Sequence, residues 1–195
     1  KTAAVLPEVK FRDRSVPRLG LGTWQMDRAG EARDTVAEAI DLGYRHIDTA
    51  QMYRNEHEAG AAMEQADVPR RDFFLTTKVW YEQLEPKPLR DSVHRSLDEL
   101  RTDYVDLLLI HWPNPDVSLA DTLETMCLLQ AEGRTRQIGI SNFPIAGMRI
   151  AADMVPIATN QVECHVFKRQ HAVRAEARAL DMAVTAYCPL ARGKV

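Results

Sequence analysis

The feature that most constrains the fold is a repeated unit, a short apolar strand followed by a helical stretch. Segments rich in Val, Ile, Leu or Thr begin roughly 20 to 33 residues apart, which is the length of a strand–helix unit. Seven strands are expected, near residues 19–24, 44–48, 73–79, 105–111, 136–141, 157–162 and 183–188. Because strands that alternate with helices form parallel sheets, and because these strands are apolar throughout, the sequence predicts an α/β fold.

The helical stretches carry their own signals. In residues 89–101 the apolar side chains recur at helical spacing and the charges lie opposite. The apolar residues of that face are Leu89, Val93, Leu97 and Leu100. A second helix is expected to begin near Ser118 and to stop at Gly133, and a third, residues 34–42, to end at Gly43. The buried side of the second helix should hold Leu119, Leu123, Met126 and Cys127.

Two parallel architectures compete, an open doubly wound sheet and a closed barrel. A dinucleotide-binding sheet should carry G-x-G-x-x-G at its first turn, but residues 20–25 read GLGTWQ and run through a strand. No phosphate-binding loop of the GxxxxGKS type is present either. A barrel predicts instead that polar or aromatic residues gather at the ends of many strands. The sequence has them at seven strand ends: Trp24, Asp48, Lys78, His111, Ser141 with Asn142, Gln161 and Tyr187.

We therefore predict a (β/α)₈ barrel with its chemistry at one face. Only seven barrel strands can be counted, whereas closing such a barrel takes eight. The expectation is a single domain, residues 1–195, that is C-terminally incomplete. Its first and seventh strands should then be open edges with unpaired backbone groups.

Composition excludes several classes of function. A formal net charge of −3 gives no electrostatic basis for binding nucleic acid or an anionic membrane. No stretch approaches the roughly 20 apolar residues of a membrane span. Pro7, Glu8 and Lys10 interrupt what would be the apolar core of a secretion signal. The three cysteines are odd in number and far apart, which fits reduced thiols in the cytoplasm better than disulfides or a zinc site.

Four side chains at neighbouring strand ends have the chemistry of an acid–base site. Tyr53 is a phenol with an ordinary pKa of about 10, and a nearby ammonium, Lys78, is expected to lower that pKa. Asp48 would pair with the inward lysine, and His111 would donate a hydrogen bond to a substrate oxygen. Each residue alone also has a purely structural interpretation, as a core histidine, a loop cap, a surface-reaching lysine or a packed tyrosine.

The chain resembles the aldo-keto reductases from Leu19 almost to its last residue. The segments that carry the resemblance are LGLGTW (19–24), GYRHIDTAQMYRNE (43–56), LTTKVW (75–80), LRTDYVDLLLIHWP (100–113), IGISNF (138–143), TNQVE (159–163) and YCPLARGK (187–194). Within the family it is most similar to the bacterial 2,5-diketo-D-gluconate reductases of the B type. The resemblance implies an NADPH-dependent reduction of an aldehyde or ketone, with Tyr53 as general acid and Asp48, Lys78 and His111 as its catalytic partners.

The resemblance also implies a cofactor site. Ser141, Asn142 and Gln161 would hydrogen-bond the nicotinamide carboxamide, and Tyr187 would stack on the ring. Cys188 stands where relatives commonly have serine, and the choice between NADPH and NADH stays open. The remaining cofactor positions implied are Thr23, Trp24, Asp48, Leu190 and Arg192.

Aromatic residues at three strand ends, together with His111, predict a compact substrate pocket formed by Trp24, Trp80 and Trp112. Methylglyoxal-like dicarbonyls and keto-sugar acids are the substrates that the resemblance implies, and a cytoplasmic monomer is expected. Two other functions stay open. One is a non-catalytic barrel of reductase ancestry, and the other is a lyase that uses Lys78 to form a Schiff base.

Overall fold

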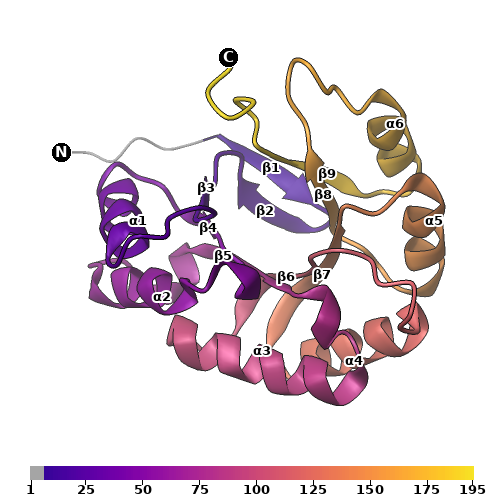
Figure 1. The fold of residues 1–195 in the computed structure, drawn as a ribbon, viewed down its shortest axis with the longest axis horizontal. Coiled ribbons are helices and arrows are strands. Elements are labelled where there is room, and N and C mark those ends of the chain that lie inside the picture. Colours follow the sequence, from indigo (N-terminus) through magenta and orange to yellow (C-terminus); the bar gives the residue numbers. More distant parts are fainter. Residues whose placement is uncertain (1–6) are drawn as a thin grey trace.

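Seven parallel strands form one curled sheet, with helices outside it, in a computed structural model that describes residues 7–195 (Figure 1). The strands follow one another in chain order: β3 (Leu21–Gly22), β4 (His46–Asp48), β5 (Phe74–Val79), β6 (Val105–Ile110), β7 (Thr135–Ser141), β8 (Thr159–Glu163) and β9 (Ala183–Tyr187). Each strand pairs in parallel with the next, and in this part of the chain β3 and β9 are the two edges. The predicted seven-stranded, incompletely closed barrel is confirmed.

Six helices surround the sheet: α1 (Glu31–Asp41), α2 (Glu56–Gln65), α3 (Pro86–Leu100), α4 (Leu119–Ala131), α5 (Ile145–Met154) and α6 (His171–Ala179). Short 3₁₀ turns lie between elements: η1 (Gln51–Tyr53), η2 (Arg70–Asp72) and η3 (Tyr81–Gln83). The predicted apolar face of α3 is buried against the sheet. Ser118 caps α4 by accepting a hydrogen bond from the backbone of Asp121, and Gly133 follows that helix with a φ of 76°.

Two local predictions need correction. The first barrel strand spans only Leu21–Gly22. Leu19 and Gly20 lie outside any strand, and beyond Gly22 the chain turns at Gln25, whose φ is 63°. On α4, Leu119 and Cys127 are half-buried at the margin of the apolar face, whereas Leu123 and Met126 are buried as predicted.

An antiparallel hairpin, β1 (Glu8–Phe11) and β2 (Arg14–Pro17), was not predicted. Phe11 and Val16 are buried and form a cluster with apolar side chains that point into the barrel, among them Leu107 and Leu109. The side-chain amide of Gln137 donates to the carbonyl oxygen of Phe11 at 2.8 Å. The hairpin therefore fills the barrel interior at the amino-terminal ends of the strands, and the opposite end stays free for polar groups. Residues 1–6, where the segment weighed as a secretion signal begins, lie outside the described residues.

Burial is uneven around the sheet. All six residues of β5 are buried, whereas no residue of β9 is. Helices α2 and α3 pack very closely beside β5: a Cβ on Gly60 would lie 2.6 Å from the backbone oxygen of Glu99. No helix within residues 7–195 has both the length and the apolar character needed to cross a bilayer.

Candidate active site

Three of the predicted catalytic residues lie together at the carboxyl ends of adjacent strands, and Tyr53 reaches them from η1. Lys78 is 1% exposed and forms an ion pair with the Asp48 carboxylate. Its ammonium also donates to the backbone oxygen of Thr49 at 2.9 Å and to the phenol oxygen of Tyr53 at 3.3 Å. A lysine ammonium has three N–H groups, so all three have an acceptor. The Tyr53 oxygen receives one hydrogen bond and keeps its own O–H to donate.

The lysine is held in its charged form. Burial disfavours an ammonium, but the adjacent Asp48 carboxylate and Tyr53 raise the pKa of Lys78 above its usual value. A lysine needs its neutral form to attack a carbonyl carbon. This arrangement therefore disfavours the Schiff-base lyase.

The expectation for the phenol pKa was wrong in sign. Burial of Tyr53 raises its pKa by more than the Lys78 ammonium lowers it, and the Asp48 carboxylate adds to the increase. Because the lysine is already paired with Asp48, its charge is largely offset. Tyr53 consequently carries its proton throughout the neutral range.

The imidazole of His111 is a neutral hydrogen-bond donor in this position. Its ring packs edge-to-face with Tyr53, with the centroids 5.6 Å apart, and with Trp80 at 5.4 Å. Burial, together with the Lys78 charge, lowers the pKa of His111 to about 4. Its buried Nδ1 has no hydrogen-bond partner among the described residues. A neutral imidazole keeps one N–H to offer to a ligand.

The polar residues that end β7, β8 and β9 form a second group joined to the first. Gln161 donates from its amide to the second oxygen of Asp48 at 2.7 Å, and the Ser141 hydroxyl donates to the Gln161 backbone at 2.8 Å. Asn142 donates to the backbone oxygen of His111 at 3.0 Å, while the Tyr187 hydroxyl donates to the Asn142 amide oxygen at 2.8 Å. All four of these predicted cofactor residues therefore lie in one network with Asp48.

The donor set of this second group fits a nicotinamide carboxamide, which has both N–H donors and an oxygen acceptor. Ser141, Asn142 and Gln161 offer hydroxyl and amide groups of both kinds, and Tyr187 adds a half-buried aromatic ring beside them. Ser141 and Gln161 are almost fully buried, whereas Asn142 and Tyr187 are half-buried. The latter two are the more accessible to a ligand.

The other predicted cofactor positions are spread out. Thr23 is fully buried, and its hydroxyl lies 3.0 Å from both the Thr49 hydroxyl and the Asn55 amide oxygen, so it is occupied by the protein itself. Cys188 begins the loop after β9 with a φ of 49°, and Leu190 is exposed. In the same loop the guanidinium of Arg192 lies 5.1 Å from the centroid of the Trp24 ring.

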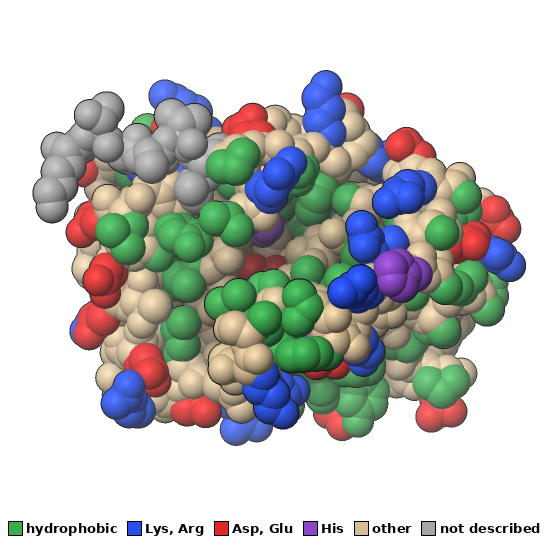
Figure 2. All heavy atoms as spheres, turned by 90° about the horizontal axis from the view of Figure 1, so that it is seen from above, with side chains coloured by type: hydrophobic (Ala, Val, Ile, Leu, Met, Phe, Trp, Pro, Cys, Tyr) green, Lys and Arg blue, Asp and Glu red, His purple; other side chains and the backbone are tan. Residues whose placement is uncertain are grey.

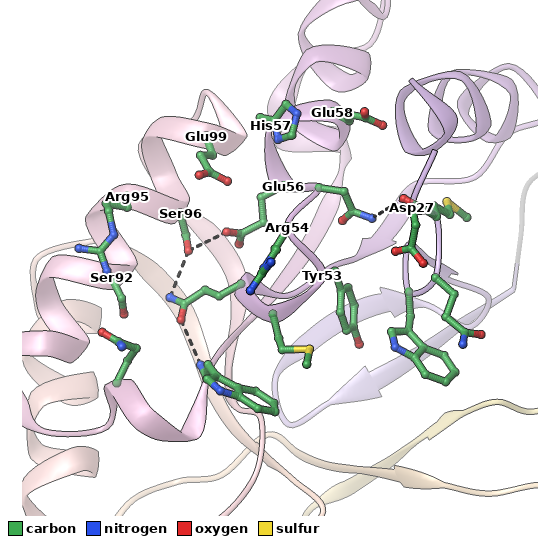
Figure 3. A pocket seen from close by; sticks show the side chains of 18 of the residues that line it. Asp27, Tyr53, Arg54, Glu56, His57, Glu58, Ser92, Arg95, Ser96 and Glu99 are labelled. Carbon is green, nitrogen blue, oxygen red and sulfur yellow. Dashed lines mark hydrogen bonds between the residues drawn. The ribbon is translucent and has the colours of Figure 1, made fainter. Parts of the chain in front are cut away.

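A cavity of about 1060 Å³ opens beside Tyr53, and Figure 3 shows how side chains from η1, α2 and α3 surround it. Trp24 and Trp80 line it, whereas Trp112 is exposed and lies outside it. Figure 2 shows one face of the molecule, with apolar side chains around a recess and charges of both signs nearby. No group of His, Cys, Asp and Glu within residues 7–195 could hold a metal ion.

Among the ionisable residues of the cavity wall that the sequence reasoning did not name, Glu56 is the buried one. Glu56 is 3% exposed and accepts hydrogen bonds from the hydroxyls of Thr77 and Ser96. Burial raises its pKa to about 7, even though both hydroxyls favour the carboxylate. A signal was present in the sequence: Ser92 and Ser96 interrupt the apolar face of α3 one turn apart, and both are buried.

Comparisons with known proteins agree with this fold. The aldo/keto reductase family model matches residues 18–195. Methylglyoxal reductase DkgB of Escherichia coli O157:H7 is 43% identical over 185 residues, and the match covers 92% of this chain and 69% of that protein. A crystal structure described as a 2,5-diketo-D-gluconic acid reductase B is 46% identical with a TM-score of 0.89, and the match covers 92% of this chain and 64% of that one.

A more distant relative has been solved with a dinucleotide. The Bombyx mori aldo-keto reductase in complex with NADP is 31% identical, with a TM-score of 0.90, over 95% of this chain and 67% of that one. The chain thus spans about two thirds of the length of these three relatives.

Proposed function

Because the chain belongs to the aldo/keto reductase family, we propose that it reduces a small aldehyde or ketone to the alcohol with NADPH as cofactor. The observation that carries this proposal is the arrangement around Lys78. Its three N–H groups bond Asp48, Thr49 and the Tyr53 oxygen, which leaves the Tyr53 O–H as the donor. The general acid is therefore Tyr53.

Proton transfer follows from the charges. The Tyr53 phenol gives its proton to the carbonyl oxygen of the substrate, and the phenolate that remains keeps the hydrogen bond from the Lys78 ammonium. His111, which is neutral at pH 7, donates its N–H to the same oxygen and stabilises the charge that develops there. When bound, the reduced nicotinamide supplies the hydride to the carbonyl carbon.

The residues proposed to hold the nicotinamide are Ser141, Asn142, Gln161 and Tyr187. Their mixed hydroxyl and amide groups support this role, as does the bond from Gln161 to Asp48, which would keep the ring close to the acid. Residues of the loop after β9, among them Cys188, Leu190 and Arg192, would contact the rest of the dinucleotide. The choice of NADPH over NADH rests on the relative solved with NADP.

The proposed substrates are small dicarbonyls and keto-sugar acids. Two relatives carry names of this kind, methylglyoxal reductase and 2,5-diketo-D-gluconic acid reductase. The indole rings of Trp24 and Trp80 beside Tyr53 would form the apolar walls.

The test is a Tyr53→Phe variant assayed with methylglyoxal and NADPH. Loss of the general acid should lower kcat by about 10²- to 10⁴-fold, while the affinity for NADPH, measured by fluorescence titration, stays unchanged. Tyr44→Phe is the matched control, because Tyr44 follows α1 and does not line the cavity. Turnover of Tyr53→Phe close to that of the control would refute Tyr53 as the acid.

A further inference from the structure

Glu56 is a buried acidic residue for which the proposed reaction has no use. It is the first residue of α2, and its carboxylate joins two other elements. One oxygen accepts from the hydroxyl of Thr77 on β5, and the other accepts from the hydroxyl of Ser96 on α3 at 3.1 Å. Thr77 directly precedes Lys78 in β5. The Glu56 carboxylate therefore holds β5 in place beside the Lys78 ammonium, which contacts Tyr53.

Ser96 extends this connection to the turn that carries Tyr53. Its hydroxyl oxygen accepts from the amide nitrogen of Gln51 at 3.2 Å, and the amide oxygen of Gln51 accepts from the backbone N–H of Trp80 at 3.0 Å (Figure 3). Gln51 is the first residue of η1 and Tyr53 is its last. Lys78 is thus connected to Glu56 through Thr77, and Tyr53 is connected to it through Gln51 and Ser96.

The turn η1 has little internal support. It is three residues long, it is held by the backbone bonds from Tyr53 to Ala50 and from Arg54 to Gln51, and it is followed by Arg54 at a φ of 58°. A single 3₁₀ turn has poor hydrogen-bond geometry and none of the cooperativity of a longer helix. Its position is therefore set mainly by side-chain anchors, and Gln51 is the anchor that joins it to α3 and to Trp80.

Close packing of α2 on α3 holds the two ends of the network together. The contact at Gly60 leaves no room for a Cβ beside the backbone of Glu99 and Leu100. Glu56 lies one helical turn before Gly60, and Ser96 lies one turn before Leu100. The helix contact thereby keeps the carboxylate and the hydroxyl within hydrogen-bond distance.

We propose that Glu56 is a positioning residue for the proton donor: through Thr77, Ser96 and Gln51 it holds η1 so that the Tyr53 oxygen stays on the Lys78 ammonium. This role rests on the proposed function only in taking Tyr53 as the acid. The geometric part, that Glu56 sets the environment of the phenol, stands on the hydrogen bonds and burial alone.

Glu56 ionises near neutrality, so a useful substitution must be judged against both the charged and the protonated carboxyl. The charged groups that act on it are Glu99 of α3, which raises its pKa, and Lys78 of β5, which lowers it, while burial is the largest influence. A carboxylate accepts from both hydroxyls, and a protonated carboxyl accepts from one and donates to the other. A glutamine amide can do the same, so Glu56→Gln preserves the connection, whereas Glu56→Ala removes it.

The experiment compares Glu56→Ala, Glu56→Gln and Ser96→Ala with a matched control, Ser92→Ala. Ser92 is buried on the same face of α3, but its hydroxyl donates to the backbone of Leu89 and takes no part in the network. We expect kcat to fall about 10-fold in Glu56→Ala and Ser96→Ala with KM nearly unchanged, because the acid is displaced and not removed. Glu56→Gln should recover most of the loss, and Ser92→Ala should match the native protein.

A second measurement reports on Tyr53 without catalysis. With ¹³Cζ-labelled tyrosine, NMR gives a phenol resonance and its pH titration, and Tyr53→Phe assigns the signal. The Tyr53 signal should move in Glu56→Ala and Ser96→Ala and stay in place in Ser92→Ala. If it stays in place in all variants, the positioning role is refuted, even where stability is lost. If the native protein reduces no carbonyl while the signal still responds as expected, the proposed function fails, and only the geometric part holds, that Glu56 sets the environment of the phenol.

Discussion

The two sides of the curled sheet hold their strand-end residues in different ways. Around β5 every strand residue is buried, and the Lys78 ammonium has an acceptor for each of its three N–H groups. Around β9 no strand residue is buried, and Tyr187 is held by one hydrogen bond from its hydroxyl to Asn142. Within residues 7–195, where β9 is an edge strand, the side proposed to transfer the proton is thus held by more contacts than the side proposed to hold the nicotinamide.

This difference has an energetic meaning. Burying the polar groups beside β5 costs desolvation free energy that the folded protein carries before any ligand binds, and in return their dipoles need no rearrangement during the reaction. The side near β9 avoids that cost. Ligand binding there should add stability, because it stabilises a folded protein in proportion to the logarithm of ligand concentration over Kd.

The largest effect expected from this comparison is on the pH dependence of stability. The pKa of Glu56 is raised from 4.5 to about 7 by burial, so the folded state favours the protonated carboxyl. Its contribution is full below pH 4.5 and is lost as pH rises to about 7, which amounts to roughly 3 kcal/mol at about 1.4 kcal/mol per pKa unit. His111, whose pKa is lowered to about 4, contributes with the opposite sign over this range in every variant. The measured quantity is therefore the difference in unfolding free energy between native protein and Glu56→Gln in urea, which should shift by this amount in favour of Glu56→Gln as pH rises.

Glu163, at the end of β8, provides the control for Glu56 on the side of the sheet near β9. A hydrogen bond from Lys168 lowers its pKa, so its contribution to stability is lost only as pH falls below the usual range of a glutamate. Between pH 4.5 and 7 the unfolding free energy of Glu163→Gln should therefore follow the same pH profile as that of the native protein. If the profile of Glu56→Gln also runs parallel to the native one, burial of Glu56 does not contribute to the pH dependence.

The next largest effect is on the free energy of unfolding, when a valine is shortened to alanine on each side of the curled sheet. Val105 on β6 is fully buried, whereas Val184 on β9 is partly buried against the same core. Val105→Ala should lower the free energy of unfolding by about 2 kcal/mol, from lost apolar burial and the cavity left behind. Val184→Ala should cost less than about 1 kcal/mol, because its site is already open. Equal losses in urea unfolding would contradict the difference in packing.

The smallest effect concerns the hydroxyl of Tyr187. Tyr187→Phe removes the hydrogen bond to Asn142 at a half-exposed site, and the free energy of unfolding should fall by about 1 kcal/mol or less. A weakened NADPH affinity with an unchanged KM for the carbonyl would place the residue on the cofactor side. A loss above about 2 kcal/mol would mean that the side near β9 is as firmly held as the side near β5.

The sequence predicted the strands and their polar ends because both signals are local. An apolar run bounded by turns marks a strand wherever it packs, and parallel strands bring their carboxyl ends to one edge, which is why Asp48, Lys78 and His111 were found together. The sign of the Tyr53 pKa shift could not be predicted. The sign depends on whether burial raises the pKa of the phenol more than the charge of Lys78, which is already paired with Asp48, lowers it. How deeply the phenol is buried cannot be read from the sequence.

The network of Glu56 and the N-terminal hairpin escaped prediction for a different reason. Glu56 meets Ser96 across 40 residues and Thr77 across 21, and each hydroxyl alone is typical of a helix or strand. The hairpin strands have four residues with one buried residue each, and a strand this short shows no recognisable alternation of apolar and polar residues. Interactions between distant segments leave little trace in any single window of sequence.

The hairpin beneath the barrel has a consequence for the order of folding. Its last strand residue before the turn, Phe11, gains a hydrogen bond from Gln137, which lies 126 residues further along the chain. Strands β1 and β2 therefore reach their final surroundings only after β7 has been synthesised. Until then the apolar face of Phe11 and Val16 lacks its partners in the barrel, and exposed apolar surface of this kind makes incompletely folded chains prone to aggregate.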